Sequence, residues 1–88
     1  MRTTPRPRRR SFERRLVLAG WSGRSAWGYD AVFECYWVEL VPGDGPAPDR
    51  GAVRIGPEGL ILTLGGLARV VARAADVPPD EAFLALTA

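Results

Sequence analysis

The sequence predicts an α+β fold, with a small three-stranded antiparallel sheet (an N-terminal hairpin plus a third strand) followed by one helix and a short C-terminal helix. The run AVFECYWVELV in the first half of the chain is rich in aromatic and β-branched residues, whereas apolar residues recur at helical spacing in the second half. Segments rich in Pro and Gly separate these patterns. At 88 residues and 47% hydrophobic content, the chain suits one domain with a modest core.

The hairpin is predicted from two alternating runs joined by a turn. Within residues 12–21, apolar residues of even number would lie on one face of a strand and those of odd number on the other. Residues 22–26 (SGRSA) are typical of a turn. Residues 27–41 contain the run AVFECYWVELV, which ends at Pro42 and which we interpret as one long strand.

This long strand is expected to carry large apolar side chains on both faces. Two helices cover only one face of a small sheet, and each large side chain left in water forgoes about 1.5–3 kcal/mol. We therefore predict that the second face is buried against another copy of the chain, as a homodimer, or against another protein. The alternative is that residues 42–51 and the turn near Trp21 and Trp27 fold over it. The predicted interface residues are Phe33, Cys35, Trp37 and Val41.

The second half of the chain predicts one short strand and two helices. Residues 42–51 form a loop, residues 52–55 a third strand, and GPEG (56–59) a turn. Thr63 is a plausible N-cap for a helix that ends near Asp76. A last helix over residues 80–86 begins with prolines and carboxylates, as helix starts do, and should dock Phe83 and Leu86.

Positive charge is concentrated at the N-terminus. Residues 1–15 hold seven Arg against one Glu, whereas residues 16–88 hold five Arg against nine acids. Residues 1–10 are expected to be a disordered Arg-rich tail, and residues 11–88 a single α+β domain. A solvated tail is the interpretation we favour, and an arm that neutralises nucleic-acid phosphates is the alternative. The residues of that arm are Arg6, Arg8, Arg9, Arg10, Arg14 and Arg15.

The segment RRSFER, residues 9–14, resembles the twin-arginine motif of exported proteins. The apolar run that follows it extends only from Leu16 to Gly20 and is too short for an export signal. We therefore expect a cytoplasmic protein that does not associate with a membrane.

The residue types that are missing exclude much familiar chemistry. All 12 cationic side chains are Arg, and the chain has no Lys, His, Asn or Gln. It therefore has no imidazole for general-base or zinc chemistry and no amine for a Schiff base. The single thiol, Cys35, is expected to be buried and inert. We expect no enzymatic activity, no metal site and no cofactor.

One segment could hold a small ligand. WSGRSAWGYD, residues 21–30, places aromatic side chains beside an arginine, which could stack a base or hold an anion. Aromatics that close a small core are the alternative explanation. The candidate pocket residues are Trp21, Arg24, Trp27 and Tyr29.

The order of motifs from residue 21 to residue 88 resembles short uncharacterised α+β proteins of GC-rich actinobacteria. These motifs are an aromatic strand after a Trp-containing turn, then VRIG, T-x-x-x-L-A-x-x-V and VPPDE. The resemblance implies a cytoplasmic bacterial accessory protein without an assigned activity. The sequence thus favours a small non-enzymatic interaction module, with a nucleic-acid-associated regulator as the alternative.

Overall fold

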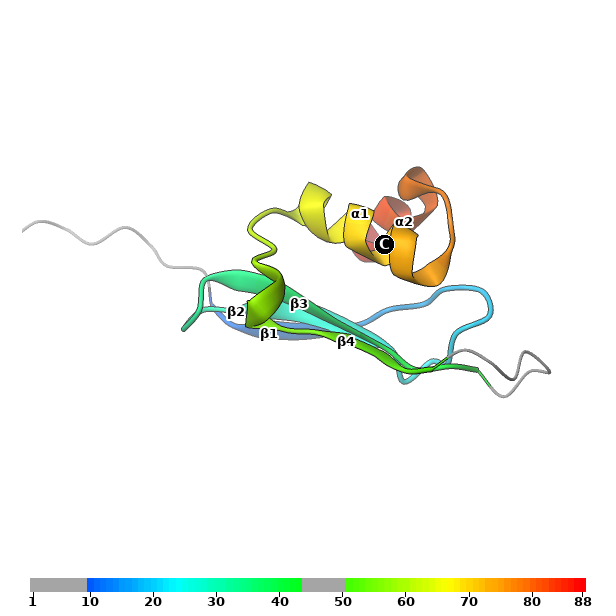
Figure 1. Cartoon of the computed structure of the whole chain (residues 1–88), viewed down its shortest axis with the longest axis horizontal. Coiled ribbons are helices and arrows are strands. Elements are labelled where there is room, and N and C mark those ends of the chain that lie inside the picture. The colour runs from blue at the N-terminus through cyan, green and yellow to red at the C-terminus, as the bar shows by residue number, and fades with distance from the viewer. Residues whose placement is uncertain (1–9, 44–50) are drawn as a thin grey trace, which may run out of the picture.

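The chain folds into two layers, with a sheet on one side and two helices on the other (Figure 1). The structure is a computed structural model that describes residues 10–43 and 51–88. The α+β class and the two helices are confirmed. The expected number of strands is wrong, because the sheet has four strands and not three. Most of the predicted tail lies outside the described residues.

The sheet is an antiparallel meander in the order β1-β2-β3-β4. Each strand therefore pairs with the next one along the chain, and β1 and β4 form the two edges. The strands are β1 (Phe12–Arg15), β2 (Ala26–Asp30), β3 (Cys35–Leu40) and β4 (Val53–Ile55).

The segment 27–41, interpreted as one long strand, in fact forms the hairpin β2–β3. Asp30 makes the break, because its Oδ1 accepts hydrogen bonds from the backbone N–H of Val32 (2.8 Å) and of Phe33 (3.2 Å). Such Asx turns replace ladder hydrogen bonds with local ones. Glu34 then adopts a left-handed backbone with φ 53°. The fourth strand was missed because a single acidic residue starts the turn within an otherwise strand-like composition.

The first strand is shorter than predicted and leads into a long connection to β2. β1 ends at Arg15, and the chain then places Leu16, Leu18 and Trp21 in the core. The buried Ser25 holds the end of this connection against β3, since its Oγ accepts from the Val41 N–H at 2.9 Å. The Ser25 hydroxyl thus accepts the hydrogen bond that a backbone carbonyl would accept within the sheet, one residue before β2 begins.

The third expected strand is confirmed as β4, and a 3₁₀ turn follows it. The expected turn over residues 56–59 is confirmed, since the Gly59 N–H donates to the Gly56 carbonyl at 3.0 Å within the 3₁₀ turn η1 (Pro57–Gly59). Glu58 accepts a hydrogen bond from the Gly56 N–H at 2.8 Å. Beyond it, the Tyr36 N–H donates to the Ile61 carbonyl at 2.7 Å. The chain therefore returns to β3 before it rises to the helical layer.

The two helices begin where the sequence indicates. α1 (Leu64–Ala75) is capped by Thr63, whose side chain accepts from the Gly66 N–H, and α2 (Pro79–Thr87) begins with a proline. Leu86 docks in the core as expected, but Phe83 stays 43% exposed. The helices pack on each other and α1 packs on β3. The residues that form the centre of the core are Trp27, Tyr36, Val38, Leu40, Leu67 and Val71.

Candidate interaction surface

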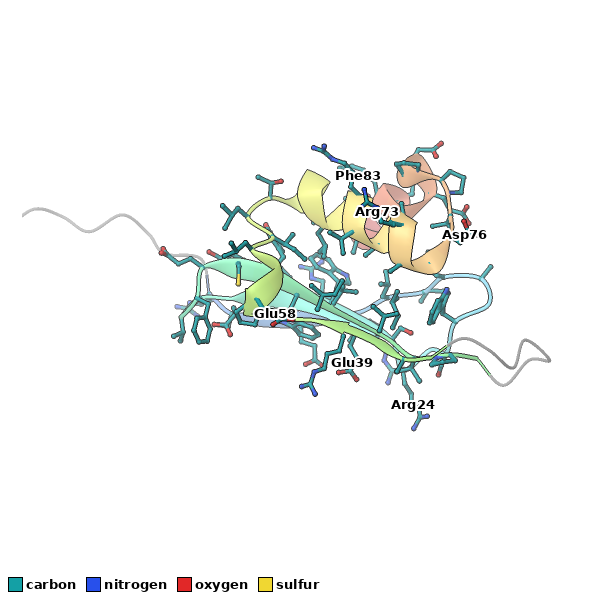
Figure 2. The ribbon with its side chains drawn as sticks, in the orientation of Figure 1. Arg24, Glu39, Glu58, Arg73, Asp76 and Phe83 are labelled. Carbon is teal, nitrogen blue, oxygen red and sulfur yellow. The ribbon has the colours of Figure 1, made fainter. Side chains whose placement is uncertain are left out.

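The face of the sheet opposite the helices is not covered by any other element of the described chain, and Figure 2 shows Glu39 pointing away from the helical layer. The register determines which residues share this face. Glu13 pairs with Gly28 and Gly28 with Trp37, while Arg15, Ala26, Glu39 and Arg54 form the adjacent row. Because side chains alternate along a strand, these two rows point to one side. We call this surface, made of Glu13, Arg15, Ala26, Gly28, Trp37, Glu39 and Arg54, the open face.

Trp37 is the large aromatic side chain of the open face. An added Cβ at Gly28 would lie only 2.7 Å from Cζ2 and 2.8 Å from Cε2 of this indole. The ring therefore lies flat over Gly28, with its other side available to solvent. It is half-buried by its own chain rather than fully exposed.

Charges of both signs flank Trp37. Arg54 Nε lies 3.6 Å from Glu39 Oε2, and both side chains are substantially exposed. Glu13 and Arg15 lie on the other side, on β1. Exposed ion pairs contribute only about 0–1 kcal/mol to folding, so these charges remain available for other contacts.

Two shallow grooves meet at the indole. One, of ≈460 Å³, extends over β3, β4 and η1 and is lined by Glu39, Arg54 and Glu58. The other, of ≈500 Å³, extends toward Ser11 and Val32. Both grooves are lined by Glu13, Asp30 and Trp37. The open face is therefore a hollowed surface around an aromatic centre.

The four predicted interface residues do not form one apolar strip. Trp37 lies on the open face, but Phe33 lies in the β2–β3 turn, where it is 63% exposed. Cys35 is enclosed by its own chain, and Val41 follows the end of β3 and is half-buried. Phe33 does not share a face with the other three residues because the turn at Asp30 removes it from the strand.

The Cys35 thiol is held in its neutral form. Burial raises its pKa, and the carboxylates of Asp30 and Glu58 raise it further. A thiol in this setting is a poor nucleophile, because the thiolate is the reactive species. In contrast, backbone N–H groups, first that of Gly56, lower the pKa of Glu58, and Arg54 adds to this effect.

The proposed ligand-pocket residues are divided between the core and the solvent. Trp21, Trp27 and Tyr29 belong to the hydrophobic core, whereas Arg24 is exposed. Figure 2 shows Arg24 extending from the side of the sheet away from the helices. Trp27 instead meets Phe12 edge-on, with ring centroids 5.4 Å apart. The three aromatic residues of this group are therefore part of the core, in agreement with the alternative to a ligand pocket.

The candidate nucleic-acid arm is only partly described. Arg6, Arg8 and Arg9 lie outside the described residues, and Arg10, Arg14 and Arg15 are exposed. The Arg14 guanidinium lies 5.4 Å from the centre of the Phe12 ring, and Arg15 donates to the Gly23 carbonyl at 3.4 Å.

Residues 10–43 and 51–88 contain no cluster of three His, Cys, Asp or Glu side chains that could hold a metal ion. No helix in these ranges is long and apolar enough to cross a membrane.

Sequence reasoning missed the charged members of the open face, namely Glu13, Arg15, Glu39 and Arg54. Their positions could have been found only from the correct register, which requires the turn at Asp30. We found no match to a protein family, to a curated protein or to a solved structure. The function is therefore argued from the geometry of this chain.

Proposed function

We propose that the chain is a small, non-enzymatic interaction module that associates with a second copy of itself through the open face. The observation that carries this proposal is the half-buried Trp37 at the meeting point of two grooves, on a sheet face that no described helix covers. Aromatic side chains at the centre of a patch with a polar rim are typical of protein interfaces.

The distribution of charge favours a second copy as the partner. The open face carries Glu13 and Glu39 together with Arg15 and Arg54. A twofold axis places each surface against its own equivalent, so such a surface must be complementary to itself. A face with both signs of charge satisfies this condition, because acids of one copy can meet arginines of the other.

The test is the mass of the full chain in solution. We expect light scattering to approach twice the 9.6 kDa chain mass as concentration rises. Trp37→Ala should weaken the dimer, and Arg54→Glu should weaken it without disturbing the fold, since Arg54 is 85% exposed. Arg69→Glu, on the helical layer, is the matched control and should leave the dimer unchanged.

A chain that stays monomeric at several hundred micromolar would contradict self-association. Equal weakening by Arg54→Glu and Arg69→Glu would show that net charge, rather than the open face, determines the assembly. A monomer that captures another protein through Trp37 would place a different partner on the same face.

The alternative function is a nucleic-acid-associated regulator. What favours it is the exposure of Arg10, Arg14 and Arg15, which continue the Arg-rich segment along the β1 edge. Phosphate contacts weaken steeply with salt, so weak binding at low salt carries no weight. Binding to duplex DNA or RNA that persists above about 200 mM salt, and is lost when these arginines become Ser, would favour this function.

A further inference from the structure

A second surface, separate from the open face, lies between the β4 edge of the sheet and helix α1. It is a groove of ≈380 Å³ lined by Ile55, Gly59, Arg69, Val70, Arg73 and Ala74. Ile55, Val70 and Ala74 are half-buried and form an apolar floor, whereas Arg69 and Arg73 are exposed. Figure 2 shows Arg73 on α1, in the helical layer above the sheet.

The floor of this groove borders an unpaired strand edge. β4 is the last strand of the sheet, so within residues 10–43 and 51–88 it has a strand neighbour on one side only. The backbone N–H and C=O groups at alternate residues of β4 therefore point away from β3. An extended peptide can add to such an edge through main-chain hydrogen bonds, with side-chain pockets providing the selectivity.

The charge on the rim determines which peptide fits. Among the described residues, neither Arg69 nor Arg73 forms an ion pair. The two arginines are four residues apart on α1, which places them on the same side of the helix, with Cβ atoms about 5–6 Å apart. Alternate residues of a strand lie on one face about 6.6 Å apart. The two guanidinium groups thus match two carboxylates at alternate positions.

A second copy of the chain fits this edge poorly. In an antiparallel β4–β4 pairing, the twofold axis would lie perpendicular to the sheet, and both α1 helices would lie on the same side of the joined sheet. The exposed Arg69 and Arg73 of one copy would then face the same arginines of the other. Like charges close together oppose association, so this edge is protected against pairing with itself.

We propose that the groove between β4 and α1 binds an extended acidic peptide, which adds a strand to β4 and places carboxylates at alternate positions on Arg69 and Arg73. Peptide side chains that point toward α1 and are not carboxylates pack against the apolar floor of the groove. This binding site does not depend on the open face or on self-association.

The experiment uses four synthetic eight-residue peptides with the full-length chain. The first has two Glu at alternate positions among Thr and Val, and two others have Gln or Lys at those positions. The fourth has the two Glu at adjacent positions, which places their side chains on opposite faces of a strand. Affinity is measured by fluorescence polarisation, and the site is located from amide shifts in NMR spectra.

We expect the alternating Glu peptide to bind and to shift the amides of Val53, Arg54 and Ile55. Its affinity should fall about tenfold in the double variant Arg69→Gln, Arg73→Gln, as expected for two exposed charge pairs. Both side chains are exposed, so the fold should be retained, as circular dichroism would confirm. Arg24→Gln, which changes an exposed cation outside both the groove and the open face, is the control and should alter the affinity less than twofold.

Three results would overturn the proposal. The first is the absence of β4 amide shifts at millimolar alternating Glu peptide. The second is equal binding of the Lys peptide or of the adjacent-Glu peptide. The third is a shift of the β4 amides with protein concentration that persists in the Trp37→Ala variant, in which the open-face dimer is weakened, since this would show that a second copy occupies the edge. Dimerisation that responds only to Trp37 and Arg54 variants tests the proposed function independently of these results.

Discussion

The indole of Trp37 lies against the backbone of Gly28, its direct partner on the neighbouring strand. The absence of a side chain at Gly28 leaves the space that the ring occupies. Glycine in a strand interior usually weakens the strand, and a close aromatic neighbour compensates for this by covering the backbone. The lack of a side chain at Gly28 therefore allows the Trp37 indole to lie close to the sheet backbone rather than project into solvent.

The Gly28→Ala variant should be clearly less stable. The added methyl group would clash with the indole of Trp37 and with the Phe12 carbonyl, and overpacking of this kind costs about 1–3 kcal/mol. The measurement is the free energy of unfolding in urea. Gly23→Ala is the matched control, because its Cβ would meet nothing within 4 Å, and it should change stability by less than about 0.5 kcal/mol. Equal effects at both positions would contradict the close packing of Trp37 on Gly28.

The Asp30→Ala variant should destabilise the β2–β3 hairpin. Asp30 Oδ1 accepts two backbone hydrogen bonds in the turn, and the loss of a comparable capping side chain costs about 1 kcal/mol. Asp30→Asn keeps a carbonyl oxygen at that place and should retain most of the stability. The measurement is the free energy of unfolding of the two variants in urea. If Asp30→Asn is as unstable as Asp30→Ala, the two hydrogen bonds are not the cause of the destabilisation.

The Cys35 thiol should make the protein less stable at alkaline pH. Its pKa is raised in the folded chain, whereas in the unfolded chain it returns to its ordinary value of about 8.5. Above that pH the unfolded chain releases a proton that the folded chain retains. The free energy of unfolding therefore falls as the pH rises, and the contribution is fully present only below the unfolded pKa.

The corresponding measurement compares wild type with Cys35→Ala in urea between about pH 7 and 10. The variant should lose less stability over this interval than the wild type. Any other group that ionises over this interval is common to both chains and cancels in the difference. Parallel pH profiles would mean that burial of the thiol has no part in the alkaline loss.

The helices were predictable because their signals are local. Thr63 as an N-cap, the apolar spacing of Leu67 and Val71, and the prolines before α2 each act within one or two turns of the chain. The sheet was less predictable, since the sequence around Asp30 has strand composition on both sides. The Asp30 carboxylate accepts hydrogen bonds from backbone N–H groups that would otherwise pair within a strand, and it thereby starts a turn. Residue composition alone does not show whether an Asp in such a segment will do this.

The candidate interface depended on this missed turn. Once β2 and β3 separate, Phe33 leaves the strand and charged residues such as Glu39 and Arg54 take their places beside Trp37. The aromatic centre was therefore predicted from the sequence, and its charged rim was not. The groove beside Arg69 and Arg73 depends on how α1 lies above β4, which is a tertiary relationship that periodicity alone does not specify.

The meander order of the strands also has a kinetic consequence. Since every strand pairs with its sequence neighbour, no ladder closes a connection longer than the segment 41–52 between β3 and β4. The entropy lost on loop closure grows with loop length, and folds with mostly local contacts form faster than folds with distant ones. The turn between β2 and β3 spans only residues 31–34, so we expect this hairpin to form before β1 and β4 pair with it.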